Sequence, residues 1–97
     1  MAGYISLLRF TKEGISAVKD SSKHIDQIKA MAEKAGARVV GIWVTMGQYD
    51  LVAVIDAPDD QAAAVLVLNL ASQGYVTTET MRAFSEDEFR AILGKLS

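Results

Sequence analysis

Short runs of apolar and β-branched residues occur at four places in the chain, and each is typical of a strand. They predict strands at residues 4–10, 39–44, 51–55 and 75–84. The segment 45–50 between the two middle runs contains Gly47 and is short enough for an antiparallel hairpin. The pattern therefore predicts that the second and third strands form a hairpin and that the first and last strands stand apart from it along the chain.

Apolar residues spaced three and four apart predict helices between these strands. One helix of about six turns is expected from the N-cap Thr11 to the stop at Gly36. A second begins after the segment 58–60, where proline and two carboxylates suit a first turn, and ends near Gly74. A serine at position 85 and a glutamate at 88 form a capping box that opens a short C-terminal helix.

The resulting order is strand, helix, strand, strand, helix, strand and a final helix. This is the split βαβ arrangement of a ferredoxin-like sandwich, an α+β fold in which both main helices cover one face of a four-stranded antiparallel sheet. With 97 residues there is room for one domain, so we expect a single domain over residues 1–97.

The two middle strands are apolar on both faces, which is unusual for a sheet with one face in water. On the first of them, alternation places Val39, Gly41 and Trp43 on one face and Val40, Ile42 and Val44 on the other. Helices can cover only one face, and a large exposed apolar patch is rare on a soluble monomer. A second copy related by a two-fold axis would cover it, which predicts a dimeric α+β barrel. The alternative is that the C-terminal helix folds over the sheet of its own chain.

Composition excludes several classes of function. The chain has no cysteine, which removes disulfides, thiolate metal sites and thiol catalysis. Its net charge of -2 with scattered basic residues argues against nucleic-acid binding. The N-terminal residues carry no basic start and no long apolar run, so we expect a cytoplasmic protein without a membrane segment.

His24 is the only histidine, and it follows Asp20 by one helical turn. This spacing suggests a general base with an orienting carboxylate as a catalytic pair. The alternative is a solvated pair on the polar face, beside Lys19 and Lys23. A single histidine makes a metal site unexpected, and no glycine motif indicates a phosphate-binding cofactor.

Aromatic residues and two carboxylates supply candidate ligand-binding positions. Trp43 and Tyr49 lie near the hairpin and could form walls of a pocket for a flat apolar ligand, or could serve only in packing. The same two alternatives apply to Tyr4, Tyr75, Met46 and Met81. Asp50 and Glu79 are carboxylates in apolar strand surroundings. Burial without a partner would raise the pKa of such a carboxyl and make it a possible base. Alternatively, Arg9 or Arg82 neutralises them, or Asp50 accepts backbone N–H groups in the hairpin.

Several short motifs in order along the chain resemble the GYD-domain family. They are Tyr4-Ile5, residues 11–15 (TKEGI), the hairpin Gly47-Gln48-Tyr49-Asp50, residues 56–60 (DAPDD) and Arg82-Ala83-Phe84. The resemblance implies a ferredoxin-like subunit of the dimeric α+β barrel superfamily. It implies no particular activity and transfers no catalytic residue. Among the wider superfamily, some members are cofactor-independent monooxygenases, isomerases or haem enzymes, and others are effector-binding modules.

These observations lead to two hypotheses of function. The first is a stand-alone, homo-oligomeric module that binds a small hydrophobic ligand or acts in assembly, without a cofactor. The second is a small cofactor-independent enzyme, monooxygenase- or isomerase-like, that acts on a hydrophobic or aromatic metabolite through His24 and Asp20. A purely structural assembly would instead have a barrel filled by side chains.

Overall fold

The computed structural model describes all residues 1–97 and has strands and helices in the predicted order. The strands are β1 (Ala2–Phe10), β2 (Arg38–Val44), β3 (Leu51–Ala57) and β4 (Val76–Ala83). The helices are α1 (Lys12–Ser16), the 3₁₀ turn η1 (Val18–Asp20), α2 (Ser21–Lys34), α3 (Asp60–Ser72) and α4 (Glu86–Leu93). All four strands expected from the sequence are present, within two residues of their expected ends.

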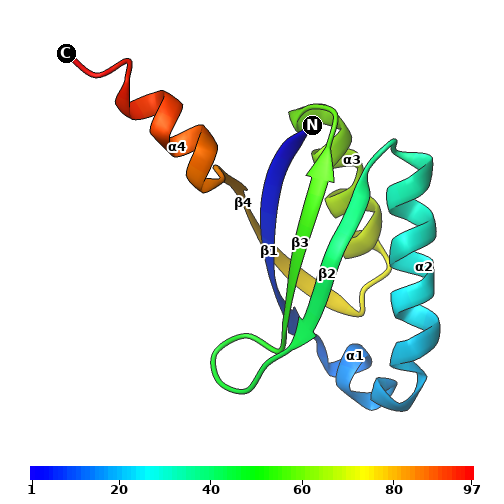
Figure 1. Cartoon of the computed structure of the whole chain (residues 1–97). Helices are drawn as coiled ribbons and strands as arrows, with labels where there is room; N and C mark the ends of the chain where they lie inside the picture. Colours follow the sequence, from blue (N-terminus) through cyan, green and yellow to red (C-terminus); the bar gives the residue numbers. More distant parts are fainter.

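The strands form one antiparallel sheet in the order β2–β3–β1–β4 (Figure 1). In its middle, Tyr4 of β1 lies opposite Ile55 of β3 and Arg82 of β4. The chain crosses from β1 to β2 through α2 and from β3 to β4 through α3, and both helices lie on the same face of the sheet (Figure 1). The predicted α+β, ferredoxin-like fold is therefore confirmed.

The core lies between the sheet and these two helices. Alternate residues of the central strands are buried there: Tyr4, Ser6 and Leu8 of β1, and Leu51, Ala53, Ile55 and Ala57 of β3. Leu66 of α3 and Ala32 of α2 pack against them. Ser6 is the one buried polar side chain, and a 2.8 Å hydrogen bond to the Thr80 hydroxyl satisfies it.

The long helix predicted between Thr11 and Gly36 is broken after α1. The hydroxyl groups of Ser16 and Ser21 donate to backbone carbonyls one turn earlier. Such side-chain bonds compete with regular helical pairing and favour irregular turns. The apolar spacing continues across the break into α2, so periodicity alone predicted one helix, and this prediction was wrong.

A close contact between α1 and the turn before β4 fixes the position of α1. Thr11 caps α1 by accepting from the Gly14 N–H at 3.0 Å, and its hydroxyl also donates to the Gly74 carbonyl at 2.6 Å. Gly14 approaches so closely that a Cβ on it would overlap the carbonyl oxygen of Tyr75. Only glycine fits this contact, which brings the start of β4 beside α1.

A β-bulge in β2 changes which residues of that strand share a face. Val39 lies opposite Ile55 and Gly41 lies opposite Val54, so Val40 is left without a partner. Val39 consequently packs against the core on the helix side, together with Ile42. The prediction that Val39 shares a face with Gly41 and Trp43 was wrong because strict alternation fails at a bulge.

The C-terminal helix α4 does not cover the sheet. It projects from the end of β4, away from α2 and α3 (Figure 1). Its capping box is formed as predicted, with Ser85 and Glu88 bonded reciprocally. Its apolar side chains, including Phe89 and Leu93, are largely exposed. The structure therefore does not support the alternative in which this helix hides the open face of its own sheet.

Candidate functional site

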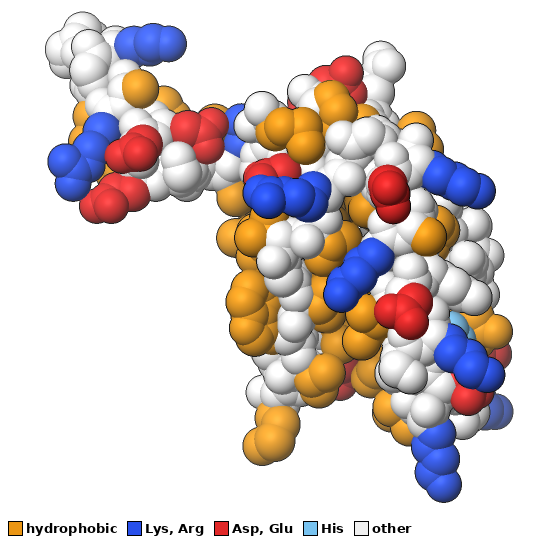
Figure 2. Space-filling model, turned by 45° about the vertical axis from the view of Figure 1, so that its right-hand side comes forward, with side chains coloured by type: hydrophobic (Ala, Val, Ile, Leu, Met, Phe, Trp, Pro, Cys, Tyr) orange, Lys and Arg blue, Asp and Glu red, His pale blue; other side chains and the backbone are white.

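The face of the sheet opposite the helices carries an apolar surface that we call the open face. Register places six apolar side chains there: Ile5, Leu7, Trp43, Val52, Val54 and Met81. Trp43 is 53% exposed and Met81 43% exposed, and no element of the chain lies over them. Hydrophobic side chains also gather along the flank of the body beneath the projecting α4 (Figure 2). The open face is thus a contiguous apolar surface.

Trp43, one of the predicted ligand-binding residues, lies on this open face and folds back along its own strand. Its six-membered ring covers the backbone of Gly41, which carries no side chain to obstruct it. The indole therefore adds a flat apolar plate to the open face and does not line a cavity inside the subunit.

Tyr49 and Glu79 form a polar cluster at the hairpin end of the open face. The Tyr49 hydroxyl donates to Glu79 Oε2 at 2.6 Å, and this hydrogen bond raises the pKa of Tyr49. The Arg9 guanidinium lies over the Tyr49 ring at 4.7 Å, and its Nε donates to the Gln48 carbonyl. Glu79 is thus paired with a tyrosine and not with either arginine considered above.

Asp50 has a structural role in this arrangement. Its Oδ2 accepts from the Phe10 N–H at 2.9 Å, and its own N–H donates to the Leu8 carbonyl. The residue thereby links the hairpin to the end of β1. Its carboxylate is occupied by a backbone donor, as the structural alternative expected.

His24 lies on α2 beside a partner that comes from another part of the chain. Its imidazole stacks on the Tyr75 ring, with a centroid distance of 4.5 Å and an interplanar angle of 26°. Asp20 belongs to η1, immediately before α2, and no hydrogen bond or ion pair joins it to His24. Asp20 ends the 3₁₀ turn that leads into α2, so it does not stand one regular α-helical turn before His24.

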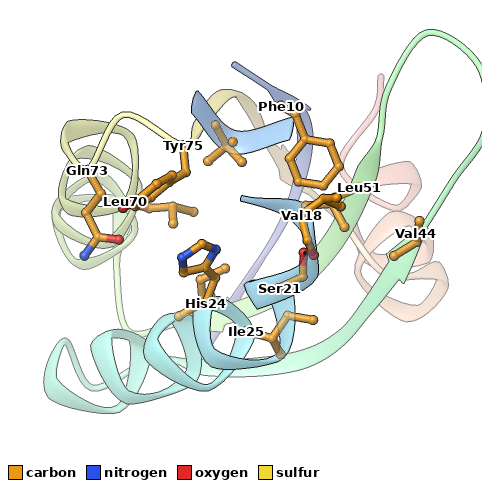
Figure 3. Close-up of a pocket in the computed structure, with 13 residues that line it drawn as sticks. Phe10, Val18, Ser21, His24, Ile25, Val44, Leu51, Leu70, Gln73 and Tyr75 are labelled. Atoms are coloured by element: carbon orange, nitrogen blue, oxygen red, sulfur yellow. Dashed lines mark hydrogen bonds between the residues drawn. The ribbon is translucent and has the colours of Figure 1, made fainter. Parts of the chain in front are cut away.

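His24 and Tyr75 border an apolar cavity of about 110 Å³ between α2 and the sheet. Figure 3 shows Phe10, Val18 and Leu51 on one side of this cavity and Leu70 with the two rings on the other. Gln73 and Ser21 are polar residues at its edge. A second void of about 30 Å³ shares Ile25, Ile28, Leu51 and Leu70 with it. The second void therefore lies next to the cavity, on its core side.

The predicted site residues therefore fall into two groups on opposite faces of the sheet. His24 lies on the helix side with the cavity, while Trp43, Tyr49 and Glu79 lie on the open face. Three residues that line the cavity, Phe10, Gly14 and Leu70, were not predicted from the sequence. Only Gly14 carried a signal, because a glycine inside a predicted helix suggests a close contact. The stacking of His24 on Tyr75 depends on tertiary structure that spacing along the chain does not reveal.

No three His, Asp or Glu side chains come together in a way that could hold a metal ion. None of the helices is both long enough and apolar enough to span a bilayer.

Comparison with known proteins identifies relatives over nearly the whole length. The model of the GYD domain family matches residues 4–93. A protein of Thermus thermophilus named glutamine synthetase and cystathionine beta-lyase binding protein is 33% identical over 84 residues. The match covers 86% of this chain and 88% of the relative.

Two crystal structures share the fold. FFRP-DM1 has a TM-score of 0.63 and 17% identity, with 87% of this chain and all of that chain covered. TTHA0845 from Thermus thermophilus has a TM-score of 0.56 and 24% identity, with 88% and 95% covered. These similarities concern the fold alone, whereas the family match and the Thermus relative establish descent. The chain belongs to the GYD domain family.

Proposed function

We propose that this protein acts by binding: it assembles with a second copy through the open face and also takes a small hydrophobic ligand. The observation that carries the assembly role is the open face itself. Its apolar side chains come from all four strands and have no cover within the chain. Apolar surface of this extent favours association, since its removal from water is the main driving force of assembly.

The total surface of the chain supports this role. The solvent-accessible area is 6557 Å², whereas a globular monomer of this mass is expected to expose roughly 5,400 Å². The excess of about 1,100 Å² is comparable to the area that one partner contributes to a standard protein interface. The radius of gyration, 14.5 Å, likewise exceeds the roughly 12.5 Å expected for this length. The projecting α4 contributes to both excesses, so they support association of the subunit without locating the interface.

The name of the Thermus relative supports a role in protein binding. That protein is named for binding two enzymes, and it shares the family and most of its length with this chain. A binding module needs no catalytic pair of side chains, which agrees with the lack of a hydrogen bond between Asp20 and His24.

The assembly role can be tested by placing a charge on the open face. Val54 lies at its centre, opposite Ile5 and Gly41. We expect the wild-type protein to sediment as a dimer or larger species and Val54→Lys to weaken association by at least about 100-fold, because an uncompensated charge in an apolar interface is unfavourable. Val65→Lys, on the exposed side of α3, is the matched control and should associate normally.

Two outcomes would contradict the assembly role. One is a wild-type protein that remains a single copy at high concentration in sedimentation velocity. The other is dissociation by Val65→Lys with no effect of Val54→Lys, which would move the interface to α3.

A second candidate function is a small cofactor-independent enzyme of monooxygenase or isomerase type. One observation favours it: His24 borders an apolar cavity suited to a hydrophobic or aromatic substrate. In this role His24 accepts a proton, and Asp20, which makes no hydrogen bond to it in this structure, would turn toward the imidazole to orient it. For any aromatic compound that the protein converts, His24→Asn should abolish turnover and Asp20→Asn should reduce it. Unchanged turnover in His24→Asn would exclude His24 as the base of this reaction.

A further inference from the structure

We propose that the cavity between α2 and the sheet binds a small aromatic molecule carrying one hydrogen-bonding group, with the ring inside and the polar group against His24. This inference deepens the ligand-binding part of the proposed function and gives it a place and a ligand class. It moves the ligand away from Trp43 and Tyr49, which lie on the opposite face of the sheet.

The size and walls of the cavity suit one aromatic ring. Apolar cavities of about 150 Å³ stay free of water and hold benzene, and this one has about 110 Å³ with the adjoining void beyond it. Val18, Leu51 and Leu70 supply aliphatic walls. Because the lining offers few polar partners, ordered water would be poorly satisfied inside, and an apolar occupant is favoured.

The shape of the cavity favours a flat occupant. His24 and Tyr75 are nearly parallel and together form one aromatic wall. Phe10 stands on the other side, so a ring that enters lies between aromatic groups (Figure 3). Offset-stacked and edge-to-face contacts of this kind stabilise aromatic pairs beyond the area they bury.

The polar group of the ligand would meet His24. Ser21 already donates its hydroxyl proton to the Val18 carbonyl, and the Gln73 amide makes a weak 3.9 Å contact with the Met31 sulfur. The imidazole of His24 has no hydrogen-bond partner within the chain, although the side chain is half-buried. A hydroxyl or carboxylate on the ring would supply that partner.

The chain contains a separate natural reporter for each face. His24 is the only histidine and marks the cavity, and Trp43 is the only tryptophan and marks the open face. We would titrate the full-length protein with phenol, benzoate and benzene while following the His24 ring signals by NMR and the emission of Trp43. All three probes should shift the His24 signals saturably. Phenol or benzoate should bind about fivefold more tightly than benzene, the usual gain from one hydrogen bond.

Two variants assign this binding to the cavity. His24→Phe should remove the preference for phenol or benzoate over benzene, measured by calorimetry, while benzene still binds. Val18→Phe should fill the cavity and weaken binding of all three probes at least tenfold. Ile15→Phe, in the same segment but outside the cavity lining, is its control and should bind normally.

The outcomes separate this site from the assembly role. Saturable His24 shifts in a protein that sediments as a single copy would support the site and contradict assembly. Self-association through the open face with no His24 shift from any probe would overturn the site alone. Shifts confined to Trp43, or equal affinities of benzene and phenol that His24→Phe leaves unchanged, would also overturn it.

Discussion

The six-membered ring of Trp43 lies over Gly41, so that a Cβ placed on Gly41 would come within 2.6 Å of Trp43 Cη2. Both residues belong to β2 and lie on the open face. The absence of a side chain at position 41 is what allows the indole to lie along the strand. The outline of the proposed interface thus depends on a pair of residues two positions apart.

Gly41→Ala should displace the indole without unfolding the protein. The obstructing atoms are the far end of a side chain that can rotate away, so we expect the melting temperature to fall by only a few degrees. The raised ring should weaken self-association by about tenfold, a change of roughly 1.4 kcal/mol. Sedimentation and Trp43 emission measure the two effects. Emission identical to that of the wild type would show that the ring does not depend on Gly41.

Gly14→Ala should be far more damaging, because its Cβ would overlap the backbone oxygen of Tyr75, which no rotation relieves. Overpacking of this kind costs about 2–3 kcal/mol. Chemical denaturation gives the loss directly. Gly94→Ala is the matched control: its added Cβ meets only ordinary contacts, so stability should be nearly unchanged. Equal stability of the two variants would refute the close contact between α1 and β4.

Asp50→Ala should destabilise the fold without removing any side chain that lines the proposed ligand cavity. It leaves the half-buried Phe10 N–H without its acceptor, which costs about 1–3 kcal/mol. Thermal unfolding is the measurement. Gln48→Ala provides the comparison, since only the backbone carbonyl of Gln48 is used, by Arg9, and its loss of stability should be small. A harmless Asp50→Ala would favour the ligand-binding role predicted for this carboxylate.

The helix α4 should lose helicity in acid through Glu88. The Ser85 backbone N–H donates to its carboxylate at 3.0 Å and, with Arg82, holds the pKa of Glu88 below its ordinary value of 4.5. A depressed pKa in the folded state means that this contribution is complete above pH 4.5 and is lost as the pH falls through the folded value. Amide NMR shifts of α4 should follow that titration.

Glu88→Gln should remove this acid transition from α4, whereas Glu86→Gln, which affects only the exposed pair with Arg90, should retain it. A transition that persists in Glu88→Gln would assign it to other carboxylates.

Features set by local sequence could be predicted, and features set by contacts between distant segments could not. The strand pattern, the Ser85 cap and the two-sided apolar character of the middle strands are local, and they led to the correct fold. The bulge at Val40 and the break after Ser16 interrupt periods that the apolar residues themselves preserve. A prediction from periodicity alone therefore made α1 and α2 one continuous helix and gave β2 strict alternation, and both predictions were wrong.

The candidate site was only partly predictable for the same reason. His24 and Trp43 stand out by their rarity, and Asp50 by its turn context. The contact of His24 with Tyr75 joins α2 to the residue just before β4, whose backbone also lies against Gly14. A cavity is a property of packed surfaces, so no spacing in the sequence could indicate it.

Strand β3 separates the cavity from the open face by the thickness of a single backbone. Leu51 borders the cavity, and Val52, the next residue, faces the other way opposite Trp43. A ligand that moved the backbone of Leu51 would also move the peptide group that joins it to Val52. Such a shift would link occupancy of the cavity to association at the open face, and each would then alter the other by the same factor.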